Sequence, residues 1–357
     1  MTANGPRFPF LAKAFEMTDR ANRRTPLTGA LTLATATALL LLSCGQSHSA
    51  VGTLPLTTVA DIALPGKTTR FDYASIDPQT RRLFIAHLGD STVAVFDLDA
   101  QKVVANIPDA GEVHGVLAIP ELGRVYASTT KTNEVATIDG KKATITARTP
   151  AGFYPDGMAY APDAHQLFVS DEVGTTETVI DTNTNMRVAT LHLWSIVGNS
   201  QYDAASGHIF VDAQTADQLV EIDPRLDKIV SRYRLPGAHG PHGLLIDSVD
   251  RLAFIGCDAN NRLLVFDLKS KQVIASFSLG KDPDVLAFDP GLKRLYVAGE
   301  AGVVSAFEVT SAGVVKVGEA FLGAKAHVVA VDAKTHLVYF PLENVDGHPE
   351  LKIMKPD

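Results

Sequence analysis

Seven aromatic residues recur along the chain at nearly constant intervals of 42, 42, 42, 44, 42 and 43 residues. A period in the forties is typical of repeat proteins, in which each unit buries its apolar face against its neighbours. The seven residues are Phe84, Tyr126, Phe168, Phe210, Phe254, Tyr296 and Tyr339. The period therefore predicts seven copies of one supersecondary unit, with these side chains packed in the core between the copies.

Residues 71–112 show what one unit contains. Four short runs, DYASI, RLFIAHL, TVAVFDL and KVVANI, are rich in Val, Ile and Phe or alternate apolar and polar residues, as strands do. Turn sequences such as Asp77-Pro78 and Gly89-Asp90 separate these runs. Four antiparallel strands in a unit of this length predict a propeller blade. The fold class is thus all-β, a seven-bladed β-propeller with four antiparallel strands per blade.

The last unit lacks its outer strand. The units begin near residues 71, 113, 156, 198, 242, 284 and 327, and the seventh has only three strand-like runs before the chain ends. Residues 56–72 resemble the outer strand and exit loop of the fifth unit, with which they share a Leu-Pro-Gly turn. We therefore expect the N-terminal strand to complete the seventh blade and close the ring. Deletion of residues 51–65 should then abolish folding.

The first 43 residues are typical of a targeting segment. Arg20, Arg23 and Arg24 precede an uncharged run over residues 27–42, which is short for a membrane span. The run ends in Leu41-Leu42-Ser43-Cys44, which resembles the lipobox of bacterial lipoproteins, where the cysteine is lipidated. Ordinary secretion with cleavage near Ala50 is the alternative.

These features predict three parts: a lipoprotein-type signal peptide over residues 1–43, a short tether over 44–53 and a propeller over 54–357. Either Met1 or Met17 could be the start. Gly45 follows the lipobox-like cysteine, and in lipoproteins this residue is compatible with transport to the outer membrane. We expect an exported protein in the periplasm or at the cell surface, anchored through a lipid at Cys44, with the outer membrane favoured.

Charge and cysteine content narrow the classes of partner. The net charge is −8, and residues 1–43 carry +3, so the remainder carries −8 minus +3, or −11. An acidic body argues against nucleic acid, because phosphate binding needs a Lys- and Arg-rich surface. Cys44 and Cys257 are the only cysteines, so no disulfide can form once Cys44 is acylated. We expect Cys257 to be a small core residue.

One position of the unit alternates acidic and imidazole side chains. Counted from the start of the inner strand, this position 0 is occupied by Asp72, His114, Asp156, Gly198, His242, Asp284 and His327. Inner strands of a propeller line its central channel, so these residues should converge at one mouth. They could form a self-satisfied hydrogen-bond network, in which each His donates to a neighbouring Asp. They could instead hold a divalent metal, with ligands drawn from His114, His242, His327, Asp72, Asp156 and Asp284. The gap at Gly198 would then admit a ligand.

Loops that follow the second strand should open on the same face. Fifteen residues after position 0 lie His87, Asp171 and Cys257, and one residue further lie Glu300 and Glu343. Neighbouring loops carry Phe153, Tyr154 and Trp194, which could form an apolar platform. Loops on a rigid scaffold are where propellers place binding residues. The candidate ligand-binding residues are therefore the six polar ring residues together with His87, Asp171, Tyr154 and Trp194.

With its repeats aligned, the chain resembles the YVTN-repeat β-propellers, the YncE-like group of exported bacterial proteins. Segments such as RLFIAHLGDSTVAVFDLDAQKVVANI and LLVFDLKSKQVIASFSLGKDPDVLAFDPGLKRLYVAG carry the resemblance, which runs from about residue 54 to the end. Pro155-Asp156-Gly157, Pro241-His242-Gly243 and Pro283-Asp284 match the family's blade starts, whereas Val197-Gly198-Asn199 departs from them. The resemblance implies the propeller fold and export, and it implies almost nothing about activity.

The favoured function is a non-catalytic binding or scaffold module for a small ligand or an envelope protein, and we expect a monomer. A metal-dependent hydrolase like the lactonase propellers is an alternative, with a divalent metal ion at the channel mouth as its only cofactor. An accessory propeller of a redox system is a third possibility. The sequence has no Cys-x-x-Cys-His haem-attachment motif, and this counts against the redox possibility.

Overall fold

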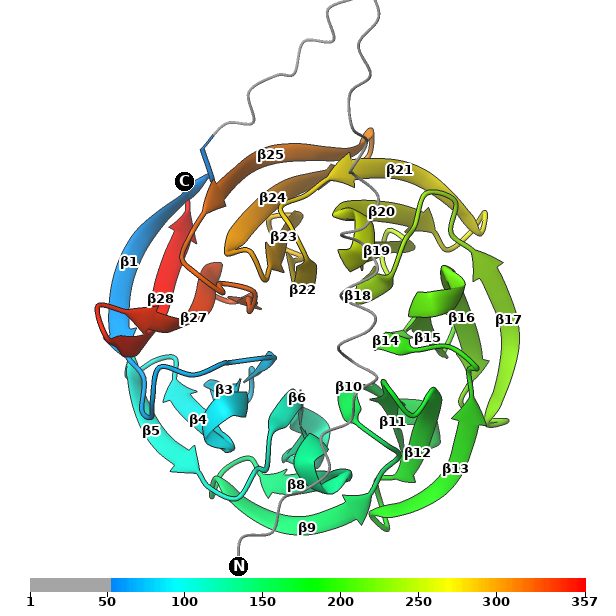
Figure 1. The fold of residues 1–357 in the computed structure, drawn as a ribbon, viewed down its shortest axis with the longest axis horizontal. Coiled ribbons are helices and arrows are strands. Elements are labelled where there is room, and N and C mark those ends of the chain that lie inside the picture. The colour runs from blue at the N-terminus through cyan, green and yellow to red at the C-terminus, as the bar shows by residue number, and fades with distance from the viewer. Residues whose placement is uncertain (1–52) are drawn as a thin grey trace, which may run out of the picture. The chain divides into compact units, whose positions relative to one another are not determined.

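Seven sheets of four antiparallel strands surround a common axis in the computed structural model, which describes residues 53–357 (Figure 1). This arrangement confirms the predicted all-β, seven-bladed β-propeller. The predicted signal peptide, Cys44 and the tether up to residue 52 lie outside the described residues. Within the described range, no helix is long and apolar enough to cross a membrane.

In the first four blades the strands follow chain order from the axis outward. Blade 1 contains β2 (Ala74–Asp77), β3 (Arg82–His87), β4 (Thr92–Asp97) and β5 (Lys102–Ile107). Blade 2 contains β6 (Val113–Ile119), β7 (Arg124–Thr129), β8 (Glu134–Asp139) and β9 (Thr144–Pro150). Blade 3 contains β10 (Pro155–Ala161), β11 (Gln166–Asp171), β12 (Thr176–Asp181) and β13 (Met186–His192). Blade 4 contains β14 (Val197–Asp203), β15 (His208–Ala213), β16 (Gln218–Asp223) and β17 (Lys228–Arg234).

The remaining blades repeat this order, except that the last takes its outer strand from the start of the chain. Blade 5 contains β18 (Pro241–Asp247), β19 (Leu252–Cys257), β20 (Arg262–Asp267) and β21 (Gln272–Ser278). Blade 6 contains β22 (Pro283–Asp289), β23 (Arg294–Gly299), β24 (Val303–Thr310) and β25 (Gly313–Phe321). Blade 7 contains β26 (Ala330–Asp332), β27 (Leu337–Val345), β28 (His348–Pro356) and β1 (Leu56–Ala63). Short 3-10 turns occur at η1 (Leu88–Asp90), η2 (Pro120–Leu122), η3 (Thr130–Thr132), η4 (Pro162–Ala164), η5 (Gln214–Ala216) and η6 (Asp258–Asn260).

The seven repeated aromatic residues pack between blades, as predicted. Each is at most 1% exposed. Phe84 of blade 1, for example, shares a hydrophobic cluster with Val116 and Val125 of blade 2. At the seam, Tyr339 of blade 7 shares a cluster with Leu83 of blade 1. One large aromatic side chain fills each contact between neighbouring blades. Each repeat of about 42 residues in the sequence therefore corresponds to one blade of the propeller.

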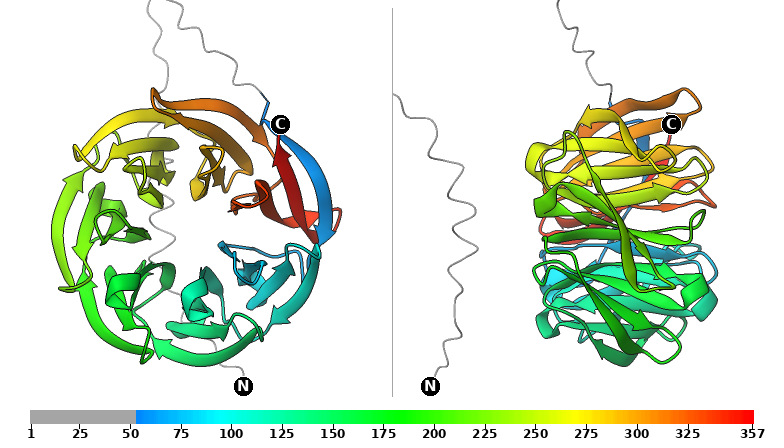
Figure 2. Two further views of the ribbon diagram at one scale, coloured as in Figure 1. Left: turned by 180° about the vertical axis from the view of Figure 1, so that it is seen from behind. Right: turned by 90° about the vertical axis from the view of Figure 1, so that its right-hand side faces the viewer.

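The N-terminal strand closes the ring. β1 pairs antiparallel with β28 from Leu56↔Pro356 to Ala63↔Glu350, and the two strands lie side by side in Figure 2. Leu56 packs in a cluster shared by blades 6 and 7, whereas Leu64 packs in the cluster between blades 7 and 1. The predicted closure is confirmed, and the first described strand contacts three blades at once.

Candidate functional site

Bulges near the start of the inner strands place the ring residues. Pairing with the second strand shifts register at this point in five blades, for example between Val113 and Val116 and between Pro155 and Met158. A bulge leaves its extra residue unpaired and re-aims its side chain. His114 and Asp156 lie inside these two bulges, and Gly198, His242 and Asp284 lie in the corresponding bulges of blades 4, 5 and 6. The ring is thus built by an irregularity that recurs from blade to blade.

Close approach of neighbouring blades explains the glycine that follows several ring residues. A Cβ atom on Gly243 would lie 2.0 Å from the carbonyl oxygen of Asp284, and one on Gly115 would lie 2.3 Å from that of Asp156. No side chain fits at either distance. Glycine at this position is therefore a packing requirement of the channel mouth.

Five of the six polar ring residues line an open cavity of about 460 Å³ at the channel mouth, here called the cup. Three positions of the repeat supply most of its wall: position 0, the residue two before it, and the residue sixteen after it. Position 0 contributes Asp72, His114, Asp156, His242 and Asp284. The residue two before contributes Arg70, Glu112, Tyr154 and Asp282, and the residue sixteen after contributes Leu88, Glu172, Asp258 and Glu300. Tyr73 and Pro283 complete the lining.

Four of the ten predicted ligand-binding residues do not line the cup: His87, Asp171, Trp194 and His327. His87 is fully buried, stacks on Phe71 at 4.1 Å and contacts the Thr69 hydroxyl. Asp171 is fully buried and accepts hydrogen bonds from the Thr176 and Thr178 hydroxyls at 2.7 and 2.8 Å. Because side chains alternate along a strand, a shift of one residue moves them from the cavity to the core. The predicted position, fifteen residues after position 0, is therefore one residue too early. The residues sixteen after position 0, Glu172 and Asp258, line the cup instead.

The two predicted loop aromatics, Tyr154 and Trp194, lie in different environments. Tyr154 lines the cup, and its hydroxyl lies 3.2 Å from Nε2 of His114. Trp194 does not line the cup; it is 79% exposed and stacks on His192 at 4.9 Å. Phe153 is also exposed, at 58%. The Cys257 thiol is buried in the core as predicted, and burial raises its pKa to about 12.

Arg70 organises one side of the cup, and its position was not foreseen from the sequence. Its guanidinium lies 3.3 Å from Asp72 and 3.8 Å from Asp284, and it also pairs with Glu300. Lys325 donates to Glu300 at 2.7 Å, and His242 Nε2 lies 3.4 Å from Asp284 Oδ1. On this side the ring is an ion-pair network, much as the self-satisfied interpretation expects.

The charges of this network lower the pKa values of two of its carboxyl groups, whereas burial raises the pKa of Asp72 although Arg70 opposes this shift. Burial alone would raise the pKa of Asp284, but the hydrogen-bonded His242, with His327 and Arg70, lowers it to about 2. Burial alone would lower the pKa of His242, but Asp284 and other nearby acids raise it to about 10. The pKa of Glu300 is also lowered, since His327, Arg70 and Lys325 outweigh its burial. We call Arg70, Asp72, Asp284 and Glu300 the Arg70 side.

Three other carboxyl groups of the cup lack such partners. Among the described residues, no Lys or Arg forms an ion pair with Asp156, Glu172 or Asp258. Burial raises the pKa of Asp156 to about 7, and it also raises the pKa values of Glu172 and Asp258. Asp156 is 5% exposed, and its Oδ1 atom is buried without a hydrogen-bond partner. Asp258 of blade 5 lies near Asp282 and Asp284 of blade 6, which also raise its pKa. We call Asp156 and Glu172, both of blade 3, the Asp156 side.

The six polar ring residues do not form a single set of metal ligands. Within the described range, the only group of three or more candidate ligands with atoms within 4.8 Å of one another is Asp72, Asp284 and His327. His327 is fully buried, and its Nε2 atom has no hydrogen-bond partner. Its Nδ1 lies 2.8 Å from the carbonyl oxygen of Lys325, which suits an Nδ1–H donor and leaves the Nε2 lone pair free. These three groups fit a divalent cation chemically, but Arg70 already contacts both aspartates.

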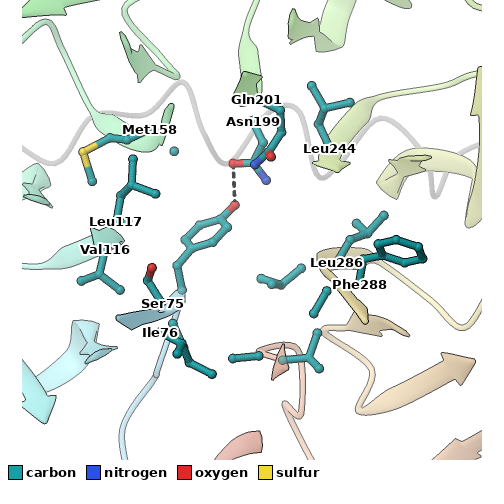
Figure 3. Close-up of a pocket in the computed structure, with 18 of the residues that line it drawn as sticks. Ser75, Ile76, Val116, Leu117, Met158, Asn199, Gln201, Leu244, Leu286 and Phe288 are labelled. Carbon is teal, nitrogen blue, oxygen red and sulfur yellow. Dashed lines mark hydrogen bonds between the residues drawn. The ribbon is translucent and has the colours of Figure 1, made fainter. Parts of the chain in front are cut away.

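A hydrogen bond across the channel forms the floor of the cup. The Tyr73 hydroxyl of blade 1 donates to Asn199 Oδ1 of blade 4 at 2.9 Å. Below it lies a second cavity of about 300 Å³, lined by residues such as Met158, Leu244 and Phe288 (Figure 3). The figure shows Asn199 accepting this bond at the wall of that cavity. The floor thus separates a cavity lined by charged side chains from one whose lining residues carry no charge.

The break in the ring at Gly198 has a structural reason. A Cβ atom there would lie 2.8 Å from the His242 carbonyl oxygen and 3.0 Å from the Asp212 Cβ atom. The expected gap for ligand entry is therefore wrong, because the backbone of the next blade and a buried aspartate fill the space. The next residue, Asn199, is the acceptor for Tyr73. Blade 4 thus departs from the repeat where Asn199 forms part of the channel floor.

Solved structures of other proteins share this fold at low sequence identity. Hydrazine synthase of Kuenenia stuttgartiensis is 15% identical, with 82% of this chain and 97% of that chain covered and a TM-score of 0.68. The WD40 repeats of RRP9 are 10% identical, covering 85% and 100%, with a TM-score of 0.72. Virginiamycin B lyase from Staphylococcus aureus is 15% identical, covering 82% and 98%, with a TM-score of 0.68. No protein-family model and no curated protein matches the chain. These identities show the propeller fold alone.

Proposed function

We propose that this chain is an exported, lipid-anchored β-propeller that binds a small ligand in the cup without catalysing a reaction on it. The observation that carries the proposal is the cup itself, a cavity of about 460 Å³ with a hydrogen-bonded floor. Small-molecule sites are typically concave and measure roughly 300–1,000 Å³. Inner strands held by seven blade contacts make the cup a preformed site, which lowers the cost of ordering it on binding.

The charge of the wall favours binding of a cation. No Ser, Thr, Cys or Lys occurs among the residues that line the cup, so its polar chemistry is carried by carboxylates, imidazoles, phenols and one guanidinium. Eight lining residues are acidic, and Arg70 is the one Arg or Lys among them: Asp72, Glu112, Asp156, Glu172, Asp258, Asp282, Asp284 and Glu300. A cup of this charge repels phosphates and attracts cations.

Protein purified from its own host without chelators should release a small molecule when it is denatured. Leu88→Trp adds bulk to the cup wall without changing its charge, so the released compound should fall well below the wild-type amount. Val249→Trp is the matched control, because Val249 is 80% exposed and does not line the cup. Mass spectrometry of the released fraction measures the compound. Equal release from all three proteins, or no release from any, would count against a ligand-binding cup.

The proposed anchor predicts where the protein is found in fractionated cells. Wild-type protein should sediment with outer membranes on a density gradient, whereas Cys44→Ser should lose the lipid and leave the membrane fraction. Cys257→Ser is the matched control, because the only other cysteine is buried in the core and should not affect anchoring. Membrane retention of Cys44→Ser, or wild-type protein in the soluble fraction, would refute the lipid anchor.

A metal-dependent activity is the second candidate, and Asp72, Asp284 and His327 favour it. Carboxylate and imidazole ligands suit several divalent transition metals, which can polarise a carbonyl oxygen. Arg70 opposes this candidate, since its fixed positive charge contacts both aspartates. A metal would have to displace the guanidinium from these two carboxylates.

A further inference from the structure

The two sides of the cup differ in how their negative charge is compensated. On the Arg70 side, Asp72, Asp284 and Glu300 share one guanidinium, and Lys325 and His242 add further positive partners. On the Asp156 side, two carboxyl groups of blade 3 face the cavity with no Lys or Arg paired to them among the described residues. The imidazoles of His114 and His242 only partly offset the effect of burial on the pKa values of Asp156 and Glu172, and His242 also pairs with Asp284 at 3.4 Å.

Asp156 is the residue that points most clearly to a missing partner. It is 5% exposed, it lines the cup, and its Oδ1 atom accepts no hydrogen bond. Buried polar atoms in folded proteins are nearly always paired, so an unpaired one beside a cavity calls for a partner there. Asp284 Oδ1 also accepts no hydrogen bond, but it has His242 at 3.4 Å, whereas Asp156 has no such ion pair within the described range. Glu172 lines the same wall, and its side chain makes no hydrogen bond or ion pair with any described residue.

We propose that Asp156 and Glu172 of blade 3 bind the guanidinium or ammonium group of a small organic cation. The proposal deepens the proposed function, since it requires that the cup binds a small ligand. The bound cation donates hydrogen bonds to Asp156 Oδ1 and to Glu172, and so supplies the positive charge that this side of the cup lacks.

Among the described residues, Asp156 and Glu172 belong to no group of three candidate metal ligands, which favours an organic cation over a metal ion. Metal ligands lie about 2.0–2.6 Å from the ion, so their atoms must gather within a few ångströms of one another. Among the described residues, only Asp72, Asp284 and His327 meet a limit of 4.8 Å, and these belong to the network around Arg70. A guanidinium carries several N–H donors over a wider area and can bridge carboxylates that are further apart.

The same geometry excludes two other ligand classes. A zwitterion would need a free cation in the cup for its own carboxylate, but Arg70 is already held by three acidic side chains. A phosphate or other anion would meet eight lining carboxyl groups. The tyrosine ring of Tyr154 also lines the cup, two residues before Asp156, and offers an aromatic surface to a cation or its aliphatic stem.

Calorimetric titration of the purified full-length protein with n-butylguanidinium tests the proposal. Its neutral isostere n-butylurea is the matched ligand, and Mn²⁺ is the metal probe. At about pH 8 and low salt, we expect one n-butylguanidinium to bind per chain and n-butylurea to bind at least roughly tenfold more weakly, because charged hydrogen bonds add about 1.5–3 kcal/mol. Added salt should weaken binding of the cation.

Conservative variants locate the subsite. Asp156→Asn and Glu172→Gln should each reduce affinity for n-butylguanidinium by roughly tenfold or more. Glu121→Gln is the charge-matched control, because Glu121 is exposed and lies in η2, after the far end of the inner strand β6. It should leave affinity unchanged. Circular dichroism melting curves confirm that each variant is folded.

Each other result would overturn a defined part of the proposal. If Asp284→Asn abolished binding while Asp156→Asn had no effect, the cation would bind on the Arg70 side and the assignment would be wrong. Binding of Mn²⁺ without binding of n-butylguanidinium would replace the organic cation with a metal. Failure of n-butylguanidinium to bind at millimolar concentration would reject the ligand class. The proposed function would survive that failure if wild-type protein, but not Leu88→Trp, still released a small molecule.

Discussion

A chain that begins at residue 66 is expected to lose its cooperative folded state, whereas one that begins at residue 51 is expected to fold. The longer chain keeps β1, and the shorter chain removes it. β1 pairs with β28 along its whole length, from Leu56 to Ala63. Without it, β28 becomes an open edge, which invites pairing with other chains.

The loss should be large because the deleted segment joins three blades. Leu54 and Leu56 pack in the cluster of blades 6 and 7, and Leu64 packs in the cluster of blades 7 and 1. Removing a buried leucine side chain costs about 2–5 kcal/mol, and three such losses approach the whole stability of a typical domain. The seam is also where the ring must close, so no other blade can compensate.

Thermal unfolding and size-exclusion chromatography measure the difference. The chain from residue 51 should melt in one sharp transition and elute as a monomer. The chain from residue 66 should aggregate, or melt broadly at a much lower temperature. A soluble, monomeric protein with an unchanged melting temperature would contradict the role of β1 in closing the ring.

The fold could be predicted because its main signal repeats. Each blade contact needs one large buried side chain, and this requirement appears in the sequence as Phe84, Tyr126 and their five equivalents. The closure was also visible, since residues 56–72 resemble an outer strand that the last unit lacks. Periodic constraints of this kind do not depend on distant pairings, so single-sequence reasoning can find them.

The cup could be predicted only in part, because its electrostatics depend on contacts that repeats do not encode. Arg70 pairs with Glu300, which lies 230 residues away in the sequence. Tyr73 donates to Asn199 across 126 residues, and this bond explains why blade 4 departs from the repeat. Position 0 marked the right face of the propeller, but nothing in the sequence order shows which carboxylates receive a cation and which do not.

Glu177→Gln is expected to stabilise the protein at alkaline pH and to have little effect near pH 4. Glu177 lies on β12 and is fully buried. Its Oε1 atom accepts hydrogen bonds from Ser170 at 2.8 Å and from Ser200 of blade 4 at 2.9 Å. Burial raises the pKa of Glu177 to about 8, although the two serine hydroxyls oppose this shift.

The direction of this pH effect on stability follows from the pKa of Glu177 in the folded and unfolded states. The unfolded chain loses the Glu177 proton near its ordinary pKa of 4.5, whereas the folded protein keeps it until about pH 8. As pH rises through this window, ionisation favours the unfolded chain, so the wild-type protein loses stability. The loss is complete above about pH 8 and is absent below about pH 4. Glutamine cannot ionise, and its amide oxygen can accept the same two serine hydroxyls.

Urea unfolding of the wild type and Glu177→Gln at several pH values between about 4 and 9 measures the effect. The free energy of unfolding should differ little at the acidic end, and the variant should be more stable by about 3–5 kcal/mol at the alkaline end. Glu308→Gln is the matched control, because Glu308 is exposed on β24, the third strand of its own blade. It should show no such pH dependence. A constant difference across the whole range would mean that the buried carboxyl group of Glu177 ionises in the folded protein as it does in the unfolded chain.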